Sequence, residues 1–187
     1  PQPVIDALNE YYMEYNSCGE RVKYEWGRKV DDKVAESRQA VLDLLKLNGK
    51  HYFVSFTLNT TYGLNLLLSQ LNLPVDKVIT SEIEHNSVFL STIEFAKKHD
   101  IERVVLERQD DGSIDLDYDF ARSLVVMNTS SNVDGRELKN IKELVKKVKK
   151  SGGFVIIDAA QTLGSNYELL QKIQADAICS SAHKMYS

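Results

Sequence analysis

Short apolar runs alternate along this chain with longer segments whose apolar residues repeat at helical spacing. Six of these runs have the length of strands, and most are rich in Val and Ile: residues 51–56, 77–80, 103–107, 123–128, 154–158 and 176–180. Buried apolar runs separated by helical segments are typical of a parallel β-sheet covered by helices on both faces. The pattern therefore predicts an α/β fold, with a mainly parallel sheet flanked by helices.

Three of the segments between these runs are predicted to be helices. One begins after an N-cap formed by Asp31 or Asp32, a second begins after an N-cap formed by Asn86 or Ser87, and a third covers residues 137–150. In the third segment the lysines lie mostly opposite the apolar stripe. We interpret them as a solvated helix face rather than as a nucleic-acid site.

Length, charge and composition narrow the class of protein. The 187 residues fit one domain, and the 43% hydrophobic and 27% charged residues are typical of globular proteins. The net charge of -4 gives no general attraction for nucleic acid. No apolar run approaches the roughly 20 residues of a membrane helix, and the first residues do not resemble a signal peptide. We therefore expect one domain over residues 1–187, in the cytoplasm, with neither a nucleic-acid nor a membrane partner.

The two cysteines, Cys18 and Cys179, are far apart in the sequence and lack the spacing of a metal or redox site. Both are expected to be reduced and structural.

Polar side chains follow five of the predicted strands. In parallel α/β sheets the ligand lies beyond the carboxyl ends of the strands, so these side chains are the candidates for a site. They are Thr60, Thr61, His85, Asn132, Asp158, Gln161, Ser181, His183 and Lys184. Each one alone has an ordinary structural explanation as a helix start, a turn, a cap or a surface lysine. Together they offer what pyridoxal phosphate needs: an anion cup, a ring partner, a carboxylate for the pyridine nitrogen, a donor to the ring oxygen and an amine.

The order of the short motifs around these residues resembles the class V aminotransferase family, whose members include cysteine desulfurases and selenocysteine lyases. The motifs are TT at 60–61, EH at 84–85, SNVDG at 131–135, DAAQ at 158–161 and SAHK at 181–184. DAAQ and SAHK are the most specific of them, and the segment at 34–45 is also similar to a helix of the family. The resemblance implies the large domain of a fold-type I pyridoxal-phosphate enzyme, truncated before the small C-terminal domain.

The resemblance also implies a role for each candidate residue. Lys184 would carry pyridoxal phosphate as a Schiff base and move protons at the substrate Cα, while His85 would stack on the ring and assist proton transfer. Asp158 would keep the pyridine nitrogen protonated, and Gln161 would donate to the ring oxygen. The remaining ligands would be Thr60, Thr61, Ser181 and His183 around the phosphate, and Asn132 near the substrate carboxylate or the ring oxygen. The resemblance implies no metal.

The family's sequence continues well beyond the position of Ser187, the last residue here. In the family, the later stretch supplies the small domain, an arginine for the substrate carboxylate and residues that complete the partner's phosphate site in a homodimer. In the desulfurases it also supplies the sulfur-accepting cysteine, and neither Cys18 nor Cys179 stands at that position. We therefore expect a fragment of a homodimeric enzyme that is inactive alone.

The function implied by the resemblance is that of a lyase or transferase acting on an amino acid, either a cysteine desulfurase, which would need a sulfur-acceptor protein, or an aminotransferase. A catalytically inactive scaffold that acts as a binding subunit stays open as an alternative. A nucleotide-binding protein is disfavoured because the chain has neither GxGxxG after the first strand nor GxxxxGK[ST]. A metal hydrolase built on His85, Asp158 and His183 would leave Lys184 and Gln161 without a role.

Overall fold

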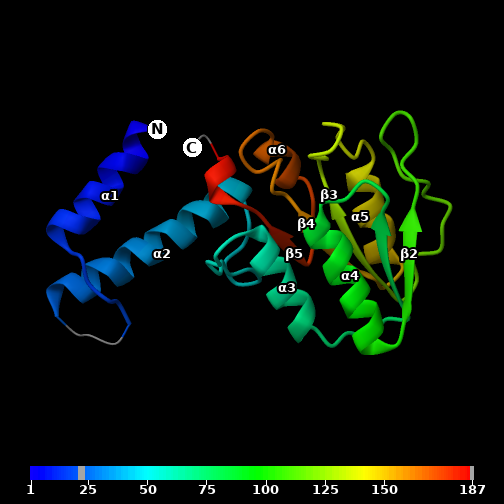
Figure 1. Ribbon diagram of the computed structural model, residues 1–187, viewed down its shortest axis with the longest axis horizontal. Helices are drawn as coiled ribbons and strands as arrows, with labels where there is room; N and C mark the ends of the chain where they lie inside the picture. The colour runs from blue at the N-terminus through cyan, green and yellow to red at the C-terminus, as the bar shows by residue number, and fades with distance from the viewer. Residues whose placement is uncertain (21–23, 186–187) are drawn as a thin grey trace. The chain divides into compact units, whose positions relative to one another are not determined.

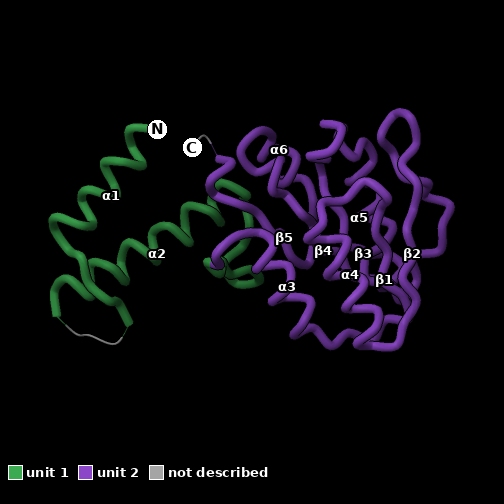
Figure 2. The backbone as a smooth tube through the Cα atoms, in the orientation of Figure 1, with its two compact units in different colours: residues 1–56, 186–187 green, residues 57–185 purple. Residues whose placement is uncertain are grey.

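The computed structural model describes residues 1–20 and 24–185, which form two compact units, residues 1–56 and 57–185 (Figures 1 and 2). The first unit contains α1 (Gln2–Glu14) and α2 (Glu25–Leu45). No residue of α1 is buried, and α2 buries only Gly27, Leu42 and Leu45. The second unit contains the sheet and is the unit that positions the candidate residues.

Two expectations for the first unit are wrong. The helix predicted to begin after Asp31 or Asp32 begins earlier, after Tyr24, and the Asp31 carboxylate accepts the backbone N–H of Glu20 at 2.7 Å instead of capping a helix. Residues 51–56 form no strand. The N–H groups of His51 and Tyr52 donate to the carbonyl of Asn48 and close a turn, so the apolar content of this segment does not reflect burial in a sheet.

The second unit is built on a five-stranded sheet whose neighbouring strands are all parallel, in the order β2-β1-β3-β4-β5. The strands are β1 (Lys77–Ser81), β2 (Glu102–Leu106), β3 (Ser123–Asn128), β4 (Phe154–Asp158) and β5 (Ala177–Cys179). Five of the six predicted strands are therefore correct to within one residue at each end, and the predicted α/β class is confirmed.

Helices cover both faces of this sheet (Figure 1). The helices are α3 (Thr60–Gln70), α4 (Asn86–His99), α5 (Ile141–Lys150) and the short α6 (Tyr167–Leu170), and a 3-10 turn follows β5 at Ala182–Lys184. Leu64 of α3 and Phe95 of α4 pack in one core with Leu124 and Val126 of β3. Because side chains alternate along a strand, Val125 of β3 points to the opposite face, which α5 covers.

The helix predicted at 137–150 is shorter at its start than expected. α5 begins at Ile141, because the Asn140 side chain pairs with the backbone of Ile114, accepting its N–H at 3.0 Å and donating to its carbonyl at 2.7 Å. The apolar stripe of α5 is buried as predicted. Among the described residues, no helix has both the length and the apolar composition needed to cross a membrane.

Candidate active site

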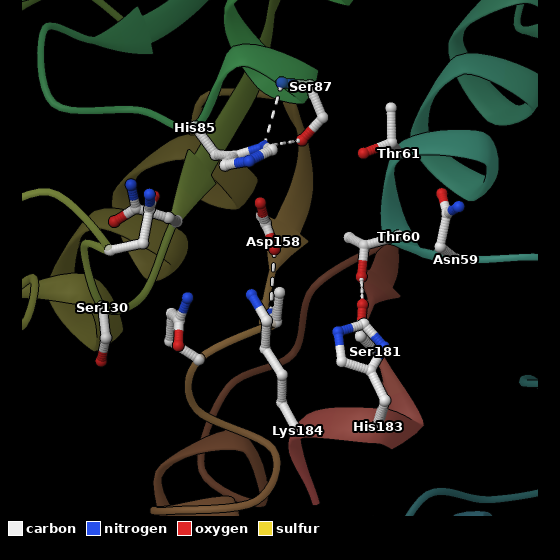
Figure 3. Close-up of a pocket in the computed structure, with 14 residues that line it drawn as sticks. Asn59, Thr60, Thr61, His85, Ser87, Ser130, Asp158, Ser181, His183 and Lys184 are labelled. Carbon is white, nitrogen blue, oxygen red and sulfur yellow. Dashed lines mark hydrogen bonds between the residues drawn. The ribbon is translucent and has the colours of Figure 1, made fainter.

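A pocket of about 270 Å³ lies at the carboxyl ends of the strands, between those ends and the start of α3 (Figure 3). All nine residues singled out in the sequence line it: Thr60, Thr61, His85, Asn132, Asp158, Gln161, Ser181, His183 and Lys184. Five further residues line the pocket that were not predicted from the sequence: Asn59, Ser87, Asn128, Ser130 and Ala160. Two of these carried a usable signal, since Asn59 is a good N-cap before a helix and Asn128 ends a predicted strand.

Asp158 forms the floor of the pocket. It is the last residue of β4, where the register pairs it with Asn128 of β3 and Cys179 of β5, and it is 4% exposed. Its Oδ1 accepts the N–H of Ala160 at 2.9 Å, and no ion pair of Asp158 is found within the described part of the chain. Burial raises the pKa of this carboxyl group, whereas the Ala160 N–H and the charges of His85 and Lys184 lower it. The floor is therefore a buried carboxylate that lacks a contacting cation.

The N-cap of α4 is His85, so the N-cap predicted at Asn86 or Ser87 is wrong, and the helix begins at Asn86. Its Nδ1 accepts the backbone N–H of Ser87 at 3.1 Å and lies 2.8 Å from the Ser87 hydroxyl. Because Nδ1 is an acceptor in this cap, the proton of the neutral ring lies on Nε2. The ring is thereby fixed beside Asp158, as Figure 3 shows.

Lys184 ends the 3-10 turn that follows β5. The turn is closed by hydrogen bonds from Lys184 N–H to the Ser181 carbonyl, at 3.2 Å, and from Met185 N–H to the Ala182 carbonyl, at 2.9 Å. Figure 3 shows the Lys184 side chain extending from the turn toward Asp158. Gly164 packs against the backbone of this turn so closely that an added Cβ would overlap the Lys184 carbonyl oxygen and lie 2.9 Å from Met185 Cα. The position of the lysine thus depends on Gly164, a residue not predicted from the sequence to belong to the site.

The opposite wall of the pocket is suited to an anion. Thr60 begins α3, whose N-cap Asn59 accepts the N–H of Tyr62 at 2.8 Å. The Thr60 hydroxyl hydrogen-bonds to the Ser181 hydroxyl, and both residues are 6% exposed. Hydroxyl groups at a helix N-terminus, where the helix dipole is positive, are typical of phosphate sites.

Neither a metal site nor a cysteine nucleophile is supported by the described residues. They contain no group of three or more His, Cys, Asp or Glu side chains arranged to hold a metal ion. Burial, together with the negative charge of Asp158, raises the pKa of the Cys179 thiol to about 12, so this cysteine is protonated at neutral pH. Cys179 is therefore a neutral thiol and not a nucleophile.

Comparison with known proteins gives consistent matches over the whole chain. Residues 1–187 match the sequence model of the family described as "Aminotransferase class-V". A probable cysteine desulfurase of Pyrococcus abyssi is 33% identical over 192 residues, which cover 98% of this chain and 47% of the relative. A cysteine desulfurase of Haloferax volcanii is 28% identical over 195 residues, covering 99% of this chain and 45% of the relative.

Solved structures agree with these matches. The apo structure of a cysteine desulfurase from Thermococcus onnurineus NA1 superposes with a TM-score of 0.87 at 30% identity, covering 99% of this chain and 47% of that chain. The present chain therefore spans about half the length of the relatives it matches.

Proposed function

Because the chain belongs to the class V aminotransferase family, we propose that it is the cofactor-binding large domain of a pyridoxal-phosphate enzyme that acts on an amino acid. One observation carries this proposal. A buried carboxylate that contacts no cation within residues 1–20 and 24–185, that of Asp158, shares a pocket with the His85 ring and the Lys184 amine. This combination meets the needs of one cofactor, whereas each residue alone has an ordinary structural explanation.

The residues of the pocket fit pyridoxal phosphate at both of its ends. The Asp158 carboxylate can accept a hydrogen bond from a protonated pyridine nitrogen, which would supply the cation that the floor lacks. At the other end, the hydroxyl groups of Thr60 and Ser181 and the N-terminus of α3 can hold the phosphate. Thr61 and His183 line the same part of the pocket.

Each residue of the pocket would then have its own role in the reaction. Bound pyridoxal phosphate supplies an aldehyde that an amine can attack and a ring that withdraws electrons from the substrate Cα. Lys184 would hold the cofactor through its amine, and the same amine would take up and return the proton at the substrate Cα. Asp158 would hold the proton on the ring nitrogen, and His85 would cover one face of the ring and keep water from it. Gln161 and Asn132 both line the pocket; Gln161 would donate to the ring oxygen, and Asn132 would bind the same oxygen or the substrate carboxylate.

Among the possible reactions we favour that of a cysteine desulfurase, since two relatives bear that name or its probable form. A desulfurase releases alanine from cysteine and passes the sulfur to an acceptor protein, whereas an aminotransferase releases a keto acid. An assay of the products formed from candidate amino acids distinguishes the two reactions. The homodimer and the cytoplasmic location expected from the sequence stay predictions.

The cofactor assignment is tested by an absorbance spectrum of the purified protein with added pyridoxal phosphate. We expect a band near the visible edge that borohydride reduction converts into a covalent label on Lys184. Lys184→Ala should lose both the band and the label, while Lys172→Ala, a change at an exposed lysine outside the pocket, should keep both. A wild-type protein without the band would overturn the proposed function.

A further inference from the structure

A second polar cluster lies beneath the pocket, at the carboxyl ends of β1, β2 and β3. It consists of Ser81, Glu84, Arg108 and Asn128, and we call it the buried clamp. The Glu84 and Arg108 side chains are 0% and 1% exposed. Only Asn128 also lines the pocket, and neither charged residue belongs to the nine candidates from the sequence. A fully buried ion pair next to a binding site calls for an explanation, because such pairs are weak contributors to stability.

The Glu84 carboxylate is bonded through both of its oxygens. Oε1 accepts the Ser81 hydroxyl at 2.5 Å and Arg108 Nη2 at 3.4 Å. Oε2 accepts the backbone N–H of Asn128 at 2.8 Å. The Glu84 side chain therefore ties the loop after β1 to the end of β3.

Arg108 ties the same two segments from the side of β2. Its Nη2 donates to Asn128 Oδ1 at 2.7 Å and to the Asn128 carbonyl at 3.1 Å, while its Nε donates to Ser81 Oγ at 3.1 Å. The Asn128 side chain links Arg108 to the loop after β1, because its Nδ2 donates to the Ile83 carbonyl at 2.6 Å. The backbone N–H of Arg108 also donates to Glu82 Oε1, at 3.1 Å. Three successive residues of the loop, 82 to 84, are thus held.

The next residue of this loop is His85. Consecutive side chains of extended backbone point to opposite sides, and His85 itself has the extended angles φ -65° and ψ 149°. With Glu84 anchored in the clamp, the His85 side chain is directed to the other side, into the pocket. The clamp also holds Asn128, which the β3–β4 register places beside Asp158. The clamp thereby contacts both the loop that carries His85 and the end of β3 beside Asp158.

We propose that Glu84 and Arg108 are a positioning pair, which holds the loop at 82–85 and the Asn128 side chain so that the His85 ring lies ready to cover the cofactor. The identity of the ligand rests on the proposed function, but the claim about the loop does not. Neither side chain reaches the pocket, so the pair acts only through His85 and Asn128. The opposing explanation is that the pair merely stabilises the fold.

Two variants separate these explanations. Arg108→Met leaves Glu84 buried without its cation and should lower the melting temperature strongly. The double variant Glu84→Met/Arg108→Met removes both charges and should recover much of that loss, since apolar replacements of a buried pair are often neutral. A structural role predicts that function recovers along with stability. A positioning role predicts that it does not.

Two measurements report on the positioning role: amide hydrogen exchange in the loop and the affinity for pyridoxal phosphate. In the protein without cofactor, amide hydrogen exchange at residues 83–88 should be at least about tenfold faster in both variants than in the wild type. The dissociation constant for pyridoxal phosphate should rise at least about tenfold in both, a change of about 1.4 kcal/mol. Leu144→Ala is the control, because Leu144 is fully buried in α5, away from the clamp. It should lower the melting temperature without changing either quantity.

The outcomes are distinguishable from those of the proposed function. A double variant that binds the cofactor as tightly as the wild type overturns the positioning role, whatever its exchange rates. If the wild type binds no pyridoxal phosphate, the proposed function fails, and exchange alone then decides the claim about the loop. Unchanged exchange at residues 83–88 overturns that claim, and faster exchange supports it.

Discussion

The floor of the pocket and the turn that carries Lys184 are held by different kinds of interaction. The floor residues Asp158 and Asn128 end neighbouring strands, and they are 4% and 3% exposed. Strand register and buried hydrogen bonds fix both of them. Lys184 is exposed and ends a 3-10 turn of three residues, which is closed by single hydrogen bonds and packed against Gly164.

The difference corresponds to the two tasks proposed for these residues. A carboxylate that holds a proton on a ring nitrogen works best where its position and surroundings are constant, because its effect is electrostatic. An amine that bonds to the cofactor and then moves a proton must change place during the reaction. A short turn at the rim allows such movement, and the interior of a parallel sheet does not.

The largest expected effect concerns the charge buried beneath the floor. Burial raises the pKa of Glu84 from its ordinary value of 4.5 to about 7, although the hydrogen bonds from Ser81 and Asn128 and the positive charge of Arg108 lower it. A folded-state pKa above the unfolded value means that stability is fully present below pH 4.5 and is lost as the pH rises through 7. We expect this group to lower the free energy of unfolding by up to about 3 kcal/mol across that window.

Urea denaturation at a series of pH values measures this effect, with Glu84→Gln as the comparison because it cannot ionise. The difference in free energy between the two proteins should change with pH mainly between 4.5 and 7. Parallel curves for wild type and variant would show that Glu84 does not titrate there.

Asp158→Asn tests the floor itself. The amide oxygen can still accept the Ala160 N–H, so the loop after β4 keeps its shape, but the negative charge is lost. We expect the dissociation constant for pyridoxal phosphate to rise about a hundredfold, since charged hydrogen bonds contribute about 1.5–3 kcal/mol. Fluorescence titration measures it. Asp176→Asn, at a carboxylate before β5 outside the pocket, is the control and should bind normally.

The sequence predicts the floor well because its strands are buried on both faces. All six residues of β3 are buried, and an apolar run of this kind can be identified without any knowledge of its neighbours. The segment at 51–56 has similar composition, but Phe53 is 88% exposed and no strand of the described sheet pairs with it. Burial depends on a partner, and the local sequence does not reveal one.

The supports of the candidate site were missed for the same reason. Arg108 is separated in the sequence by 24 residues from Glu84 and by 20 from Asn128, yet it contacts both. Gly164 contacts Lys184, which is also distant in the sequence. The local apolar pattern shows where each strand ends. Because the strands are parallel, their carboxyl ends then lie at one edge of the sheet. Contacts that hold the side chains at this edge depend on register and packing, so they require the structure.

Gly164→Ala tests the turn. The added Cβ would overlap the Lys184 carbonyl oxygen and crowd Met185 Cα, so the turn must shift. Overpacking of this kind costs typically 1–3 kcal/mol, and we expect a rise in the pyridoxal-phosphate dissociation constant of about tenfold or more. Gly49→Ala is the control, because its Cβ would meet only Leu42 Cδ1, at an ordinary 3.5 Å. Normal labelling of Lys184 and normal affinity in Gly164→Ala would mean that the turn tolerates displacement.

The smallest effect is expected where the turn meets the start of α3. Thr60→Val keeps the branched shape of the side chain but removes the hydroxyl that pairs with buried Ser181. The loss of one neutral hydrogen bond costs about 1 kcal/mol, so binding of pyridoxal phosphate and of inorganic phosphate should each weaken several-fold. Thr61→Val is the matched control, since Thr61 lines the pocket but is exposed, and its effect should be smaller. Equal effects of the two variants on inorganic phosphate would remove the Thr60–Ser181 pair from the anion site. A larger effect of Thr60→Val would show that the phosphate is held at the junction between the 3-10 turn and the start of α3.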